Sequence, residues 1–441
     1  MEFAPHTESE VREMLRTIGV DSVDDLFATI PPAVRLDRPL DIPPGVSEME
    51  ILADLGRLSR RNRSTDDLIC FAGGGAYDHY VPSVVWALAG RSEFYTSYTP
   101  YQPELSQGVL RALFEYQSMV CELTGLDVSN ASLYDGPTAL AEAVNLVRGR
   151  EGRDRILVSS ALDRRYTDTL RTYGRGAGYA VEVFDAVGGR GGTPAAAPDV
   201  AAVVFQHPNV YGILEPVGDL VAAAHAMDAK AIQVFDPVSL GVLAPPGALG
   251  VDVAVGEGQA LGNHLNFGGP YLGLLAAREE FLRRLPGRIV GETLDLDGRT
   301  GYVLTLQARE QHIRRDKATS NICTNQTLMA VAAAIHLSWL GPQGLVDVGR
   351  ACASKASYAA ERLTAIDGVE LVFPEAPFFK EFALRLPRGA SGVRDALVDR
   401  GYLAGVPLTD LDANALLVAV TERRTREEID AFARAMGEVL A

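Results

Sequence analysis

The fold of this chain is indicated most clearly by residues 231–237, which read Ala-Ile-Gln-Val-Phe-Asp-Pro. The mostly apolar run predicts a strand buried on both faces, and Asp236 follows at its carboxyl end. An aspartate in this setting can pair with the protonated pyridine nitrogen of pyridoxal phosphate (PLP). Enzymes built in this way also need a lysine further along the chain, which holds the cofactor as a Schiff base.

The segment that should carry this lysine has none. Residues 255–270 read VGEGQALGNHLNFGGP, and the four lysines of the chain are Lys230, Lys317, Lys355 and Lys380. Arginine supplies nearly all the other basic residues, but a guanidinium with a pKa above about 12 cannot deprotonate to form a Schiff base. The sequence therefore predicts the frame of a PLP enzyme without its nucleophile, and we interpret Asp236 as a vestigial residue that stabilises its own loop.

Short apolar runs alternate with helical stretches from about residue 130 onward. They lie at 156–158, 180–184, 200–205, 231–235, 251–255 and 272–276, and they predict buried parallel strands joined by crossover helices. A helical region at 326–365 is followed by strand-like runs at 369–373, 382–386 and 415–420, and by a helix that begins at Thr425. This last part predicts a small α+β domain.

The first residues predict a helical arm. Thr7 and Glu10 have the spacing of a capping box before a helical pattern, and a proline-rich connector follows at 31–44. We therefore expect three parts: residues 1–129 as the helical arm with an active-site loop region, 130–325 as a large α/β domain, and 326–441 as a helical connection with the small domain.

Composition narrows the class of protein. The chain has 441 residues, of which 47% are apolar and 22% charged, and its net charge of −16 argues against nucleic acid as a partner. Without a recognisable membrane span or signal peptide, we place it in the cytoplasm. Its four cysteines are scattered, and His207 and His264 have no companions at metal-ligand spacing, so we expect reduced thiols and no metal.

Three motifs are candidates for a site. The turn at 135–138, Asp-Gly-Pro-Thr, leads into a helix whose N-terminus could hold a phosphate near Thr138, although Pro137 has no N–H and could equally begin a helix that binds nothing. Residues 94–108 form an irregular loop with three tyrosines, which presents rings to a ligand or is simply structural. Residues 309–325 join a basic cluster to a polar turn, and the arginines there also fit a salt-bridged surface.

Together, residues 93–108, 134–142, 267–270 and 307–325 closely resemble glycine decarboxylase, the P protein of the glycine cleavage system, and in particular its subunit 1. The resemblance covers nearly the whole chain. It implies an aspartate-aminotransferase-like fold (PLP fold type I) with a mostly parallel sheet. In this family two homologous halves pair, and only the other half, subunit 2, carries the PLP lysine. Pro137 departs from the more usual Asp-Gly-Ala-Thr of the family.

The resemblance also implies a reaction and partners. Glycine would be decarboxylated in an α2β2 assembly, and the aminomethyl group would pass to the lipoyl arm of H protein. Candidate residues toward the shared site are Tyr95, Tyr98, Thr99, Tyr101, Gln102, Arg314, Arg315, Asn321, Thr324 and Asn325. Two alternatives remain open at this point: a self-sufficient PLP lyase or aminotransferase that uses Lys317, and a structural pseudoenzyme subunit without a role in catalysis.

Overall fold

The computed structural model describes residues 5–148 and 153–441, and the chain divides into two compact units, Met1–Asn62 and Arg63–Ala441. The first unit, the arm, contains α1 (Glu8–Ile18) and α2 (Glu48–Ser59). Thr7 and Ser47 begin these helices with capping boxes, as the sequence predicts for Thr7. None of the described arm residues is buried, so local capping forms these helices and no core of their own supports them.

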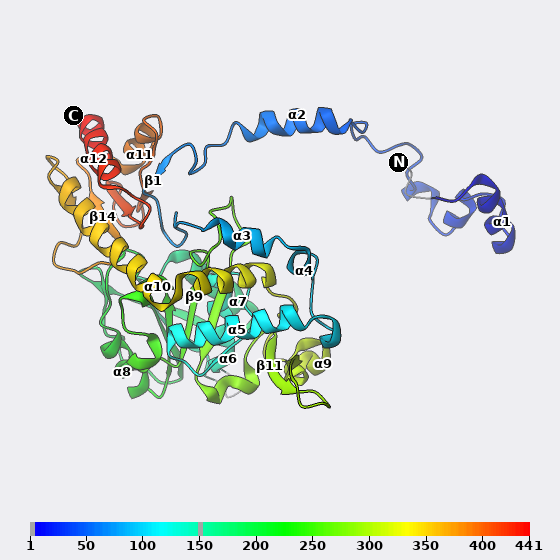
Figure 1. Ribbon diagram of the computed structural model, residues 1–441, viewed down its shortest axis with the longest axis horizontal. Coiled ribbons are helices and arrows are strands. Elements are labelled where there is room, and N and C mark those ends of the chain that lie inside the picture. The colour runs from blue at the N-terminus through cyan, green and yellow to red at the C-terminus, as the bar shows by residue number, and fades with distance from the viewer. Residues whose placement is uncertain (1–4, 149–152) are drawn as a thin grey trace. The chain divides into compact units, whose positions relative to one another are not determined.

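The second unit is built on a seven-stranded sheet, seen in green and cyan in Figure 1. The strand order is β2 (Val128–Ser129), β10 (Gly273–Ala277), β9 (Val253–Glu257), β8 (Lys230–Phe235), β7 (Val200–His207), β3 (Arg155–Ser159) and β4 (Ala180–Phe184). Strands β9, β8, β7, β3 and β4 are parallel to one another. This confirms the predicted fold class and the position of each predicted strand to within two residues.

Both faces of the sheet are covered, which is why its strands read as continuous apolar runs. Along β7, Val204 packs on one face with α6 (Gly136–Arg148) and α7 (Arg164–Ala177), whereas Val203 and Phe205 pack on the other face with α8 (Val217–Ala226). Helix α5 (Gln107–Thr124) and the first half of α10 (Thr327–Thr364) cover the β9–β10 end of that second face. The alternation follows from the period of two along a strand.

One detail of the sequence prediction was wrong. Strand β10 is antiparallel to β9, because the loop between them returns the chain without a crossover helix. A small hairpin follows β4, in which β5 (Ala186–Val187) pairs with β6 (Arg190–Gly191). A second hairpin outside the central sheet joins β11 (Ile289–Leu294) and β12 (Thr300–Thr305).

The C-terminal part forms its own sheet and core. Strands β13 (Glu370–Leu371), β14 (Glu381–Arg385), β17 (Ala415–Ala419) and β16 (Val406–Pro407) are antiparallel in that order. Helices α11 (Ala390–Val398) and α12 (Arg426–Leu440) pack on this sheet, and β1 (Ile69–Cys70) pairs with β15 (Tyr402–Leu403) beside it. This confirms the predicted small α+β fold. The predicted boundaries at 129 and 325 fall inside the second unit and stay a prediction.

Helix α10 connects the two sheets and bends between them. Gly341 has a φ of 62° and Pro342 follows it, so the regular helical path is interrupted there. By length and composition this helix is apolar enough to cross a membrane. Ala330, Ala333 and Cys352 are nonetheless buried in the protein, as in the core helix of a folded domain. Two short helices, α3 (Ser83–Ala89) and α4 (Ser92–Tyr95), lie beside α10.

Candidate functional site

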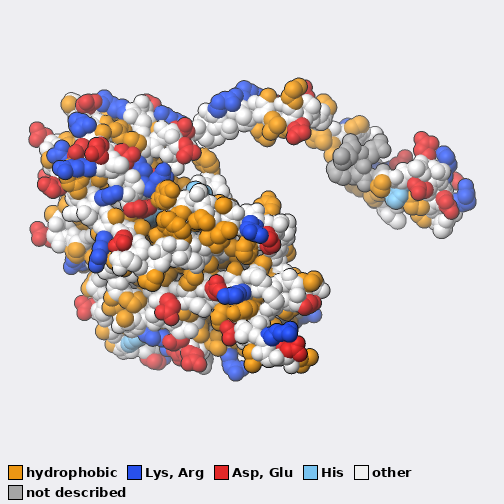
Figure 2. Space-filling view, in the orientation of Figure 1, with side chains coloured by type: hydrophobic (Ala, Val, Ile, Leu, Met, Phe, Trp, Pro, Cys, Tyr) orange, Lys and Arg blue, Asp and Glu red, His pale blue; other side chains and the backbone are white. Residues whose placement is uncertain are grey.

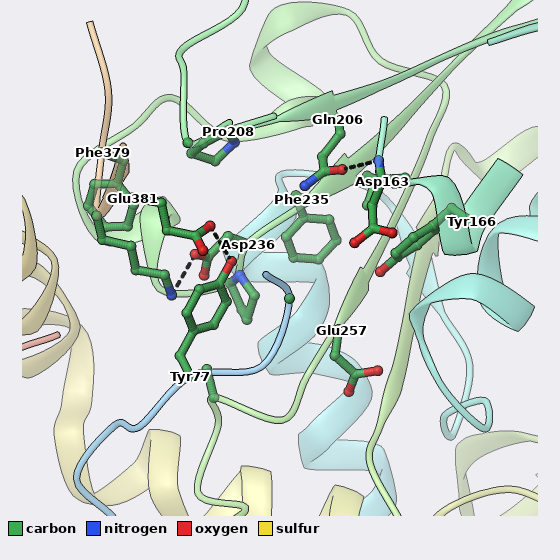
Figure 3. A pocket seen from close by; sticks show the side chains of 16 residues that line it. Tyr77, Asp163, Tyr166, Gln206, Pro208, Phe235, Asp236, Glu257, Phe379 and Glu381 are labelled. Carbon is green, nitrogen blue, oxygen red and sulfur yellow. Dashed lines mark hydrogen bonds and ion pairs between the residues drawn. The ribbon is translucent and has the colours of Figure 1, made fainter. Parts of the chain in front are cut away.

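The region around Asp236 lies at the carboxyl ends of the parallel strands, where ligands bind in open α/β sheets. Asp236 follows β8 and Glu257 ends β9, and both line a cavity of about 40 Å³. Figure 3 shows Asp236, Glu381 and Tyr77 on one side of this cavity and Tyr166 with Asp163 on the other. A volume of this size holds only a few water molecules.

Asp236 has a charged partner that the sequence analysis did not identify. The ammonium nitrogen of Lys380 lies 2.6 Å from Asp236 Oδ2, and both side chains are largely buried. Asp236 Oδ1 also accepts a hydrogen bond of 2.9 Å from the backbone N–H of Val238 in its own loop. The carboxylate that would face a pyridinium therefore already has a cation of the chain beside it.

Lys380 belongs to a wider buried network. Its ammonium lies 3.0 Å from His79 Nε2 and 3.5 Å from the centre of the Tyr77 ring. Because an ammonium can only donate, His79 Nε2 accepts, and Nδ1 carries the proton that it donates to Glu422 at 2.6 Å. Asp236, Lys380, His79 and Glu422 thus form one continuous chain of charged and polar side chains.

This network also bears on metal binding. His79, Cys352 and Glu422 have potential ligand atoms within 4.8 Å of one another. A metal would have to displace the Nδ1 proton of His79 while the Lys380 ammonium lies against the same ring, and that positive charge opposes a cation. Of the two histidines considered from the sequence, His207 Nδ1 accepts from the Glu215 N–H at 3.0 Å, and His264 lies against Trp86.

The N-terminus of α6, the predicted phosphate position, has its free N–H groups satisfied within the chain. The Gly136 N–H donates to Glu257 Oε2 at 3.0 Å, and the N–H and hydroxyl of Thr138 both donate to Asp135 Oδ1 at 2.8 Å. The Ala139 N–H donates to the Asp135 carbonyl, and Pro137 has no N–H. No backbone donor in this turn remains for a phosphate, and Thr138 is directed to Asp135.

Side-chain packing closes the same position. A Cβ atom built on Gly136 would lie 2.0 Å from the Tyr166 hydroxyl, so this ring rests directly against the backbone of the turn. PLP requires room for its ring, an anion-binding turn for its phosphate and a free carboxylate for its nitrogen. In this chain Tyr166 lies against the turn, the N–H groups of the turn are bonded within the chain, and Asp236 is paired with Lys380. The residues at these three positions therefore do not fit the cofactor.

Two glutamates of the cavity are held in unusual surroundings. Burial raises the pKa of Glu257 to about 7, although the backbone N–H groups of Leu272, Gly136 and Gln259 donate to its carboxylate. Burial likewise raises the pKa of Glu381 to about 7, against hydrogen bonds from the Gly74 N–H and the Tyr77 hydroxyl. Both carboxyl groups therefore titrate near neutral pH.

The predicted tyrosine loop lies on the surface. Tyr95, at the end of α4, is 69% exposed, Tyr98 is 74% exposed and Tyr101 is 60% exposed. Thr99 and Gln102 shape the loop through their carbonyls, which accept from the N–H groups of Tyr101 and Leu105. Several exposed aromatic rings close together are unusual on a surface that contacts only solvent, and they are frequent where another molecule binds.

The 309–325 segment places its candidate residues in two different environments. Arg315 and Asn321 line a wide hollow together with Arg148 and Tyr173 from α6 and α7, and Arg314 and Asn321 are exposed. Thr324 is half-buried. Asn325, by contrast, donates to the Ala131 carbonyl and the Ser132 hydroxyl at 2.9 and 3.0 Å, so its amide holds the segment in place.

Lys380 and Glu257 are the residues that sequence reasoning missed. Lys380 directly precedes strand β14 of the C-terminal sheet, far from Asp236 along the chain, and no local pattern there distinguishes it from a surface lysine. Glu257 could have been identified, because it lies two residues after the run predicted as a buried strand at 251–255. Ligands bind at this end of the strands in such sheets. Lys317, the alternative nucleophile, is exposed in the 309–325 segment and is not among the described residues that line this cavity.

Comparisons with known proteins agree with this geometry. The family model of the glycine cleavage system P-protein matches residues 1–436. The chain is 50% identical to the probable glycine dehydrogenase (decarboxylating) subunit 1 of Chlorobium limicola, with 99% of each chain covered. It is also 50% identical to the protein of the same name from Moorella thermoacetica, with 100% of each covered.

Solved structures give the same relationship. A crystal structure of glycine decarboxylase (P-protein) of the glycine cleavage system, in inhibitor-bound form, matches with a TM-score of 0.92 and 48% identity, covering 100% of both chains. A sphingosine-1-phosphate lyase of Burkholderia pseudomallei, at 17% identity and a TM-score of 0.67 over 93% of this chain and 94% of that one, shares the fold. The chain has the fold of type I PLP enzymes, and it belongs to the glycine cleavage system P-protein family.

Proposed function

We propose that this chain is subunit 1 of a glycine dehydrogenase (decarboxylating), and that it acts only with a second subunit that holds PLP. The relatives that match its full length carry the subunit 1 name, and the family is PLP-dependent. The observation that supports PLP binding by the partner alone is the small cavity beside Asp236, which we call the filled cavity because the chain's own residues occupy the cofactor positions. Lys380 neutralises Asp236, and Glu257 takes the N–H of Gly136 at the α6 turn.

The partner of this proposal needs a surface on this chain, and several features support one. The tyrosine loop is exposed, Arg315 and Asn321 line an open hollow, and the arm carries exposed apolar side chains, with Met49 78% exposed. Figure 2 shows apolar side chains gathered over α3 and α10, where Trp339 is 55% exposed. Uncovered apolar area of this kind marks protein interfaces.

In the assembly, this chain contributes positioning and shielding, and PLP on the partner supplies the electron sink for loss of carbon dioxide from glycine. The hydroxyls of Tyr95 and Tyr98 and the amide of Asn321 are neutral donors that can orient a charged substrate without competing for its protons. We place the lipoyl-bearing H protein as the acceptor of the aminomethyl group and an α2β2 heterotetramer as the working form, and we place both in the cytoplasm.

Reconstitution tests this proposal directly. The chain, a subunit 2 and lipoylated H protein are purified separately, and exchange of labelled bicarbonate with the glycine carboxyl group is measured for each combination. We expect exchange only when both subunits and H protein are present, and a PLP spectrum from subunit 2 but none from this chain. Full exchange by subunit 2 without this chain would leave it a structural role only, and exchange by this chain without subunit 2 would reassign the cofactor to it.

A further inference from the structure

Arg288 connects the two exposed segments that we assign to the shared site. It lies just before β11 and is only 4% exposed. Its Nη2 donates to the Tyr101 hydroxyl at 3.1 Å and to the Cys323 carbonyl at 2.7 Å. One buried guanidinium therefore links the tyrosine loop to the 320–325 turn, although these segments are far apart in the sequence.

The guanidinium also contacts the Tyr101 ring, whose centre lies 5.0 Å from its central carbon. Tyr101 is itself largely exposed, so the contact with Arg288 anchors an otherwise solvent-facing side chain. A hydrogen bond from a charged donor is stronger than one between two neutral groups. This contact can hold the loop in one orientation.

The backbone around Arg288 is fixed from the other side. The Ala131 N–H donates to the Arg288 carbonyl at 2.8 Å, and Asn130 Nδ2 donates to the Pro286 carbonyl at 2.9 Å. Asn325 is bonded to the same 131–132 loop. Arg288 is therefore held on a rigid turn, and it transmits the position of that turn to Tyr101 and Cys323.

We infer that Arg288 is a positioning residue: it fixes the tyrosine loop relative to the 320–325 turn, so that both present their side chains to the partner's site in one arrangement. This inference rests on the proposed function. Arg288 itself is buried beneath these segments and acts through them. Misplacement of a substrate-orienting group by about 1 Å can cost roughly a hundredfold in rate.

The test uses Arg288→Met, with Arg309→Met as the matched control. Arg309 is half-buried and donates to a neighbouring backbone carbonyl, that of Leu285. This hydrogen bond reaches neither the tyrosine loop nor residues 320–325. Tyr101→Phe removes the hydroxyl that accepts from Arg288 and keeps the ring, so it weakens the link from the exposed side and keeps the test informative if Arg288→Met folds poorly.

Two readouts separate the inference from the proposed function. Hydrogen exchange of the amides of 97–105 in the isolated chain reports on the loop alone. We expect faster exchange in Arg288→Met and Tyr101→Phe and no change in Arg309→Met. In the assembled enzyme we expect kcat for glycine exchange to fall about tenfold to a hundredfold with Arg288→Met, and the double variant with Tyr101→Phe to lose little more.

The outcomes decide between the two levels. If amide hydrogen exchange of residues 97–105 is unchanged in both Arg288→Met and Tyr101→Phe, the inference is overturned, whatever the glycine exchange activity of these variants. A loosened loop with undiminished glycine exchange also overturns it, because the loop would then be anchored without serving the site, although the chain could still be subunit 1. Equal and additive losses from Arg288→Met and Arg309→Met would reduce Arg288 to a general contributor to stability.

Discussion

The ammonium of Lys380 and the carboxylate of Asp236 lie 2.6 Å apart, with side chains that are 2% and 12% exposed. Asp236 directly follows strand β8 of the large sheet, and Lys380 directly precedes strand β14 of the C-terminal sheet. The pair therefore joins the two sheets of the second unit at the point where a related enzyme would hold its cofactor. The positive charge that a cofactor would place beside Asp236 is supplied here by Lys380.

Lys380→Met should destabilise the fold strongly, because Asp236 would be left as a buried charge without its partner. Losing one member of a buried pair costs about 3 to 5 kcal/mol. Urea unfolding of the isolated chain measures the loss, and adding Asp236→Asn to Lys380→Met should recover part of it. Lys230→Met is the control, since Lys230 pairs with Glu280 nearer the surface and should cost about 1 kcal/mol or less. Equal losses for the two lysines would contradict the role given to the buried pair.

Incubation of the isolated chain with excess PLP, followed by borohydride and peptide mapping, should give no stoichiometric pyridoxyllysine. The reason is the absence of a lysine between residues 231 and 316, together with the filled cavity. Trace labelling of exposed lysines is expected and carries no weight. One pyridoxyl group per chain at Lys317 or Lys380 would mean that the chain holds its own cofactor.

Co-expression with subunit 2 should give a heterotetramer with two copies of each chain. A site divided between chains requires a permanent interface, on the order of 2,000 Å² or more, and the arm has no buried residue among its described part. Light scattering at micromolar concentration gives the mass. If the two chains elute separately with monomer masses, the shared site is untenable.

Tyr95→Phe, Tyr98→Phe and Asn321→Ala should each lower glycine exchange more than they lower assembly or thermal stability. Losing one preorganised hydrogen bond to a developing charge costs a factor of about 10² to 10³ in rate. Tyr80→Phe serves as the control, because Tyr80 is 57% exposed but lies outside the tyrosine loop. Full exchange activity in all three variants would show that these side chains are scaffold.

The unfolding free energy should fall as the pH rises from about 5 to about 8, in part because of Glu381. Its pKa is about 7 in the folded chain against an ordinary value of 4.5. The stability it contributes is therefore complete below the ordinary value and is lost as the pH rises through 7. Glu381→Gln should remove a share of this dependence, on the order of 3 kcal/mol at most. Parallel pH profiles for the two proteins would argue against a buried carboxyl that titrates near 7.

Local patterns predicted the elements of this fold well. The run at 180–184 has the bounds of β4, although β4 is the edge strand of the sheet and is not buried as predicted. Thr7 and Thr425 begin helices because a hydroxyl and a glutamate three residues later cap them. Buried strands were recognisable because both faces of the sheet are covered. The direction of β10 was not, since a strand's sequence does not record the direction in which its neighbour runs.

The candidate site was less accessible to prediction. The absence of a lysine after Asp236 could be read from the sequence, but the pairing of Asp236 with Lys380 could not, because the contact joins two separate sheets. Tyr95 and Tyr98 were predicted from the tyrosine-rich composition of residues 94–108, and both are exposed in the structure. Arg288 was overlooked because its significance lies in bonding Tyr101 and Cys323 together, and pairings at such sequence separation leave no periodic trace.

The filled cavity also constrains how this chain could change over evolutionary time. A substitution that introduced a lysine near residue 260 would place its amine beside a space already taken by Tyr166 and Glu257, with Asp236 still bound to Lys380. Acquiring the cofactor would require several of these residues to change together, and breaking the buried pair alone would destabilise the fold. No single substitution therefore builds a PLP site in this chain, and under the proposed function its dependence on a second chain is hard to reverse.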